Sequence, residues 1–60
     1  MTRDQMKTEA LLAVPYAQAA RELSPPDEDG SIVFTVDDGK ELFAVTVLPD
    51  GTIGGIKPVM

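Results

Sequence analysis

The chain has 60 residues, ten acidic side chains against five basic ones, and no histidine, cysteine or tryptophan. A chain of this length forms a single domain, because domains usually run to about 50–200 residues. Without cysteine there can be no disulfide scaffold, thiolate nucleophile or cysteine-based zinc site. Without histidine the chain lacks the usual general base and the commonest metal ligand. These absences predict a non-catalytic protein with no catalytic, cofactor-binding or metal-binding residues.

The net charge of −5 argues against a surface for phosphates, because nucleic-acid affinity comes largely from clustered basic side chains. The basic residues are scattered along the chain: Arg3, Lys7, Arg21, Lys40 and Lys57. Anionic membrane surfaces are disfavoured for the same reason. No apolar run approaches the ~18 residues that span a bilayer. We therefore expect no direct contact with nucleic acid or membrane. The apolar run at residues 10–14 is five residues long, below the ~7–15 of a signal peptide, so we expect a cytoplasmic location.

The first 24 residues have the pattern of a helical arm. Thr2 and Gln5 have the spacing of a capping box, and Met1 and Met6 occupy the two staple positions around it. Small and apolar residues then recur with a period near 3.6. They form two rows: Met6, Ala10, Ala13, Ala17 and Ala20, and Leu12, Tyr16, Ala19 and Leu23. Pro15 predicts a kink or break near Val14, with a second helical segment from Pro15 to about Leu23.

Residues 25–30 predict a solvated connector, because two prolines and three consecutive acids stop a helix. Residues 27–31 partly match the start of a twelve-residue calcium-binding loop. In that loop glycine stands at position six and glutamate at twelve, whereas here glycine stands at four and the twelfth residue is Asp38. The match therefore fails.

Residues 31–37 and 41–48 are rich in valine, isoleucine, threonine and phenylalanine, which favours strands. Asp38 and Gly39 between them predict a two-residue type I′ hairpin that pairs Asp37 with Lys40 and Phe34 with Phe43. This register puts six apolar residues on one face: Ile32, Phe34, Val36, Phe43, Val45 and Val47. The other face then carries Val33, Thr35, Leu42, Ala44, Thr46 and Leu48.

A third strand is expected over residues 52–59, after a turn at Pro49, Asp50 and Gly51 that has the pattern of a type I turn with a bulge. Ile53 and Ile56 are an odd number of positions apart, which regular pleating would send to opposite faces. A bulge at the intervening glycines returns both to one face. The alternative is that these glycines allow a close approach of a ligand.

The predicted fold is α+β, with a helix kinked or broken at Pro15 (residues 1–24), an acidic proline-rich linker (25–30) and a three-stranded antiparallel meander (31–60). One helical arm covers one face of such a sheet, and a small scaffold gains little net stability alone. We therefore expect a homodimer. The predicted interface consists of Val33, Leu42, Ala44, Leu48, Leu12 and Tyr16. The alternative is a monomer that presents this apolar patch to another protein.

The predicted function is that of a small interaction or accessory protein that acts as a homo-oligomer. The alternative is an acidic inhibitor, or nucleic-acid mimic, that occupies a basic groove on a partner enzyme. Asp37, Asp38 and Glu41 at the hairpin tip could suggest acid and base chemistry, but an exposed turn requires such residues for its own geometry.

Overall fold

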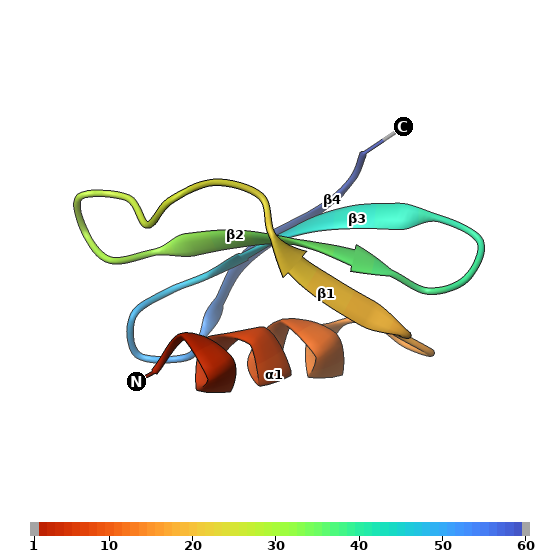
Figure 1. Cartoon of the computed structure of the whole chain (residues 1–60), viewed down its shortest axis with the longest axis horizontal. Helices are drawn as coiled ribbons and strands as arrows, with labels where there is room; N and C mark the ends of the chain where they lie inside the picture. The colour runs from red at the N-terminus through yellow and green to blue at the C-terminus, as the bar shows by residue number, and fades with distance from the viewer. Residues whose placement is uncertain (1, 60) are drawn as a thin grey trace.

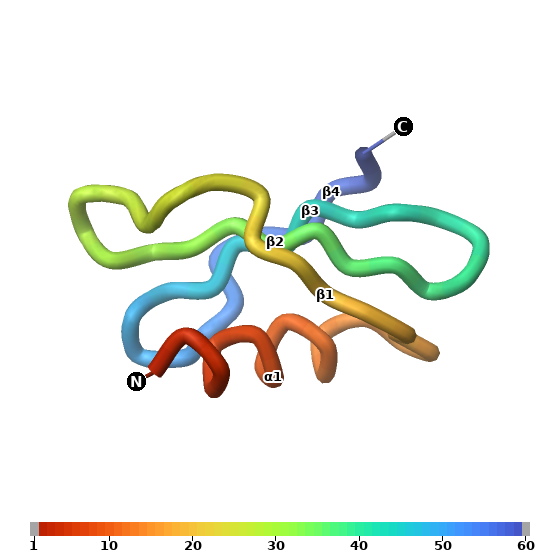
Figure 2. The backbone as a smooth tube through the Cα atoms, in the orientation of Figure 1, coloured from red at the N-terminus to blue at the C-terminus, as the bar shows by residue number. Residues whose placement is uncertain are grey.

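The computed structural model describes residues 2–59, which form one helix and four strands (Figure 1). The chain order is α1 (Arg3–Ala13), β1 (Ala19–Glu22), β2 (Ile32–Asp37), β3 (Leu42–Val47) and β4 (Ile53–Pro58). The strands make one antiparallel sheet in the order β1-β2-β3-β4. The trace in Figure 2 runs as a meander above α1, which lies along one side of the sheet. The α+β class and the antiparallel meander are confirmed.

Helix α1 begins and ends where its local sequence requires. The Thr2 hydroxyl accepts a hydrogen bond from the Gln5 backbone N–H at 3.2 Å, and the Gln5 side chain accepts one from the Thr2 N–H at 2.9 Å. This is the predicted capping box; the expected partner Met1 lies outside the described residues. At the other end Val14 is extended, with φ −112° and ψ 121°. The helix therefore breaks before Pro15, as predicted.

The second helical segment predicted after Pro15 is wrong, because those residues form strand β1. The Gln18 N–H donates to the Asp37 carbonyl at 2.7 Å, and Ala19 then pairs with Asp37. Ala20 is buried between two exposed neighbours, which is the two-residue period of a strand. Pairing with the open edge of β2 thus overrides a local preference for helix. The sheet has four strands instead of the predicted three.

Tyr16 turns the chain from α1 into β1 with a left-handed backbone. Its φ is +61°, and the turn is closed by a hydrogen bond of 3.3 Å from the Ala17 N–H to the Val14 carbonyl. This conformation destabilises a residue other than glycine by about 1–2 kcal/mol. The Tyr16 side chain is 91% exposed, so no packing offsets this strain.

Tyr16→Gly is therefore expected to stabilise the fold by about 0.5–1 kcal/mol, since relief of strain exceeds the extra entropy of an unfolded glycine. Urea denaturation followed by circular dichroism measures the change. Tyr16→Ala is the matched control, because it removes the ring and keeps the strained φ. If the glycine and alanine variants gained equal stability, the backbone explanation would be wrong.

The β2–β3 hairpin differs from the prediction in its register. Asp37 pairs with Leu42 and Val36 with Phe43, so the loop has four residues, 38–41. Gly39 has a φ of +94° but Asp38 does not have a positive φ, whereas a type I′ turn needs both. The Asp38 carboxylate instead accepts from the N–H groups of Lys40 and Glu41, at 2.9 and 2.7 Å. These bonds supply partners for the backbone of a longer loop.

The faces of β2 and β3 are still those predicted, because a shift of two residues keeps every side chain on its side of the sheet.

The strand predicted over residues 52–59 is observed as β4. The Gly51 N–H donates to the Leu48 carbonyl at 2.9 Å, and Gly51 has a φ of +92°. The register then shifts between Thr46 and Val47, so that Val45 faces Ile56 and Val47 faces Ile53. The predicted bulge therefore puts both isoleucines on one face.

The core lies between α1 and one face of the sheet. Helix α1 and the residue after it supply Met6, Ala10 and Val14, each at most 5% exposed. The sheet supplies Ala20, Ile32, Phe34, Val36, Val45 and Val47. Phe43, predicted for the same face, is half-buried against this cluster. A single apolar layer thus joins helix to sheet, and the other face of the sheet takes no part in it.

Candidate functional site

The candidate site is the face of the sheet that points away from α1, which we call the outer face. Its residues alternate with the buried ones, and directly paired residues share a face. The Leu23 N–H donates to the Val33 carbonyl, and the Val59 N–H to the Leu42 carbonyl, each at 2.8 Å, so both edges extend the face. The outer face consists of Ala19, Arg21, Leu23, Val33, Thr35, Asp37, Leu42, Ala44, Thr46, Leu48, Gly55, Lys57 and Val59.

Four of the six predicted interface residues meet on the outer face. Val33, Ala44 and Leu48 are half-buried, and Leu42 is 38% exposed. Neighbours within the same sheet give this partial burial, since the helix of the described chain packs on the opposite side. The other two predicted residues lie elsewhere: Leu12 projects from α1 and is 75% exposed, and Tyr16 lies in the α1–β1 turn. The structure thus separates the predicted patch into two surfaces.

Leu48 packs against the β-bulge. A Cβ atom added to Gly54 would lie 3.3 Å from Leu48 Cδ2 and 3.5 Å from Thr46 Cγ2. The protein's own side chains therefore fill the space that the missing Gly54 side chain leaves. This favours the structural interpretation of Gly54 over close approach of a ligand.

Basic residues stand on both edges of the outer face. Arg21, Thr35, Ala44 and Lys57 form one row across the four strands, with a basic side chain at each end. Within residues 2–59 the one ion pair joins Arg3 to Glu22, at 3.5 Å, so Arg21 and Lys57 have no acidic partner there. Asp37 is the acidic residue of the face, whose side-chain charge is therefore +1. The net charge of the whole chain is −5, so the residues outside the outer face carry a net charge of −6.

The sequence did not point to Arg21 or Leu23 as site residues, because the segment that holds them was predicted to be helical. The available signal was the alternation around Ala20. A strand of four residues is too short for that alternation to be distinguished from a helical stripe of alanines.

Acidic residues gather at the two ends of the sheet. The β1–β2 and β3–β4 connections share one end, where Gly30 approaches Pro49, and they carry Asp27, Glu28, Asp29 and Asp50. The β2–β3 loop forms the other end and carries Asp38, Lys40 and Glu41, which with the adjacent Asp37 give this end a net charge of −2. The charge pattern is thus basic at the two edges and acidic at the two ends.

Three of these carboxylates are anchored by their turns. The N–H of Ser31 donates to Asp29 at 3.0 Å and lowers the pKa of that carboxyl group. The N–H of Glu41, followed by that of Lys40, lowers the pKa of Asp38. The hydroxyl and then the N–H of Thr52 lower the pKa of Asp50. These groups are acceptors of turn hydrogen bonds, which is a structural use of their charge.

The lowered pKa values predict a loss of stability in acid. Each carboxylate is bound to these donors in the folded chain alone, so its contribution is complete above the unfolded pKa of about 3.9 and is lost as the pH falls through the lower folded value. We expect the urea midpoint to be flat from about pH 7 to 5 and to fall below about pH 4. Asp38→Asn keeps an acceptor oxygen without the charge, and its acid dependence should be shallower. An identical profile for this variant would contradict the assignment.

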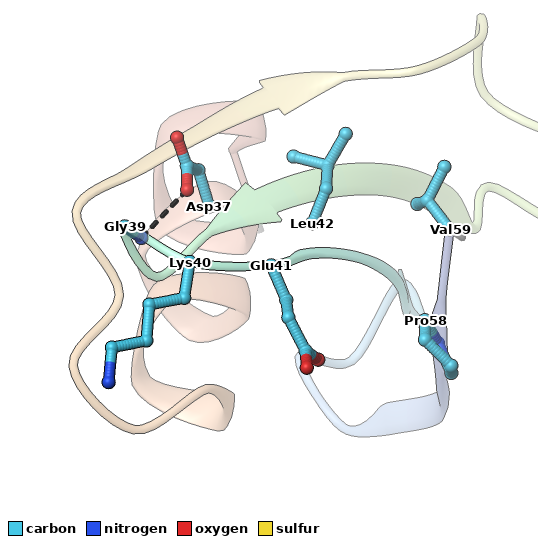
Figure 3. Close-up of a pocket in the computed structure, with 7 residues that line it drawn as sticks. All are labelled: Asp37, Gly39, Lys40, Glu41, Leu42, Pro58 and Val59. Carbon is cyan, nitrogen blue, oxygen red and sulfur yellow. Dashed lines mark hydrogen bonds between the residues drawn. The ribbon is translucent and has the colours of Figure 1, made fainter.

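A cleft of about 820 Å³ lies at the corner between the β2–β3 loop and the end of β4 (Figure 3). It is lined by Asp37, Gly39, Lys40, Glu41, Leu42, Pro58 and Val59. In Figure 3 Leu42 and Val59 point to the same side as Asp37, whose carboxylate accepts from the Gly39 N–H at 2.7 Å. The cleft therefore continues the outer face around its corner. Lys40 and Glu41 point to the other side.

Residues 2–59 contain no group of three or more side chains that could together hold a metal ion. No helix in this part of the chain has the length and apolar character needed to cross a membrane. Comparisons of the chain with protein-family models, with curated proteins and with solved structures give no match.

Proposed function

We propose that this protein is a small non-catalytic interaction protein that acts as a homodimer, and that two copies associate through their outer faces. The observation that carries the proposal is a sheet with apolar residues on both faces and a helix on one of them. The outer face offers Leu23, Val33, Leu42, Ala44, Leu48 and Val59 to a partner. Contiguous apolar surface of this kind usually marks an interaction site.

The size of the protein supports a partner that covers a whole face. A standard interface removes about 800 Å² from each partner. The accessible surface here is 4099 Å², so such an interface takes about a fifth of it. A second copy supplies an identical apolar face, and two-fold dimers are the commonest symmetric assemblies. Covering both outer faces also adds the core that so short a chain lacks.

Size-exclusion chromatography with light scattering, over a wide range of protein concentration, tests the proposal. We expect a dimer that dissociates on dilution. Ala44→Lys puts a charge at the centre of the outer face and should weaken the dimer by at least about 100-fold, because a buried unpaired charge is costly. Leu12→Lys is the matched control on the α1 side and should leave it unchanged. A folded monomer at micromolar concentration would contradict the proposal.

The alternative is an acidic inhibitor that occupies a basic groove of an enzyme. The acidic ends of the sheet favour it, since complementary charge speeds such an association. Its affinity would be lost between low and moderate salt, whereas association through apolar faces would survive. A dimer that persists at about 1 M salt therefore favours the homodimer.

A further inference from the structure

We infer that two copies stack with their strands crossed at nearly a right angle, so that the acidic ends of each sheet lie over the basic edges of the other. This inference rests on the proposed function, because it concerns the geometry of the same outer-face dimer. It follows from the positions of the charges around that face.

The charges stand on all four sides of the outer face. Arg21 lies midway along edge strand β1 and Lys57 within edge strand β4, in the same row. The acidic connection with residues 27–29 lies before β2, and Asp37 and Asp38 stand at the opposite end of this strand, where the Asp37 side chain points to the same side as Leu42 and Val59 (Figure 3). In Figure 1 the β1–β2 connection lies on the side of the sheet away from α1, which is the side of the outer face.

Packed sheets adopt one of two arrangements, with strands aligned within about 30° or crossed near 90°. In a two-fold dimer with aligned strands, each end lies over an end and each edge over an edge. Acid would then meet acid and base would meet base all around the interface. With crossed strands, each end lies over an edge, so that acid meets base on every side. Like charges brought together weaken association, and opposite charges support it.

The dimensions of the sheet permit the crossed arrangement. Strands about 4.8 Å apart place the two edges about 7 Å from the centre of a four-stranded sheet. A strand of six residues reaches about 10 Å from the centre at each end. The face is therefore about 14 Å wide and about 20 Å long, and the long side chains of Arg21 and Lys57 extend its shorter dimension. Because both are exposed and without an acidic partner in residues 2–59, they are free to pair across the dimer.

Neutralising the basic edges is the first arm of the test. Arg21→Gln with Lys57→Gln should raise the dimer dissociation constant at low salt by about tenfold, because each copy loses two rim pairs. The aligned arrangement predicts the opposite, since removing repulsion between edges would tighten the dimer. Arg3→Gln with Lys7→Gln is a control with the same change of composition and charge on α1, and it should have little effect. Unchanged or tighter association of the edge variant would overturn the inference.

Cross-linking between copies is the second arm. Because the chain has no cysteine, each single variant carries one thiol at a known position. Single variants place a thiol at an edge, Arg21→Cys or Lys57→Cys, or at an end, Pro26→Cys or Asp37→Cys. A short bis-maleimide reagent applied to mixed pairs should join an edge to an end. Cross-links that join end to end or edge to edge, in a protein that is still a dimer, would overturn the crossed geometry alone. A monomer in light scattering would overturn the proposed function as well.

Discussion

Phe34→Ala is expected to unfold most of the protein at room temperature. Phe34 is 1% exposed, lies on central strand β2, and is one of the four largest fully buried side chains. Truncating a buried phenylalanine to alanine costs about 3–5 kcal/mol. A small core rarely supplies more than about 3–5 kcal/mol in total, so this single change removes most of the stability.

Circular dichroism and urea denaturation at a fixed protein concentration measure this effect. The fixed concentration matters because dimerisation adds to the apparent stability by mass action. Leu12→Ala is the control: it also truncates an apolar side chain to alanine, but at a position that is 75% exposed, and it should change the free energy of unfolding by less than about 0.5 kcal/mol. Cooperative unfolding of Phe34→Ala at the wild-type midpoint would mean that the core is placed incorrectly.

Ala10→Leu has the second largest expected effect, a loss of about 1–3 kcal/mol. Ala10 is completely buried on α1 and lies in the cluster that joins the helix to the sheet. A larger side chain there must push α1 away from the sheet or force its neighbours out of their rotamers. Helix propensity alone would leave the stability almost unchanged, because leucine forms helices almost as well as alanine.

The control for this prediction is Thr8→Leu, which enlarges an exposed side chain on the same helix. It should be neutral or slightly stabilising, in line with helix propensity. Urea midpoints of the two variants separate packing from propensity. If Ala10→Leu proved as stable as the wild type, the helix would have to sit further from the sheet than the structure places it.

Much of the local structure could be predicted because its causes lie within a few residues of each other. The capping box at Thr2, the break before Pro15 and the turn at Gly51 each depend on one or two backbone groups and the side chains beside them. The inward face of β2 and β3 was also predictable, since alternation of apolar residues withstands a register error of two positions. The bulge between the pairs of Thr46 and Val47 followed from the spacing of Ile53 and Ile56.

The segment after Pro15 could not be assigned in the same way, and for this reason Arg21 was not predicted to lie on the candidate site. Its alanines, glutamate and leucine favour helix when considered alone. They become a strand because Tyr16 reverses the chain and brings Ala20 against the core, beside the open edge of β2. Arg21 reaches the outer face through that pairing alone. Likewise, Leu12 and Tyr16 could be recognised as apolar, but their distance from Val33 depends on which face α1 covers.

The amino-acid sequence by itself determined the α+β class, the helix start, the two central strands with their faces, and an excess of apolar surface for so short a chain. The tertiary structure alone decided that the sheet gains a fourth strand, that the β2–β3 loop has four residues, and that basic edges and acidic ends surround one open face. The physical reason is the separation along the chain of the residues that interact. Caps, turns and alternation act between near neighbours in the chain, whereas an edge strand and a pattern of charge depend on which distant segments come together.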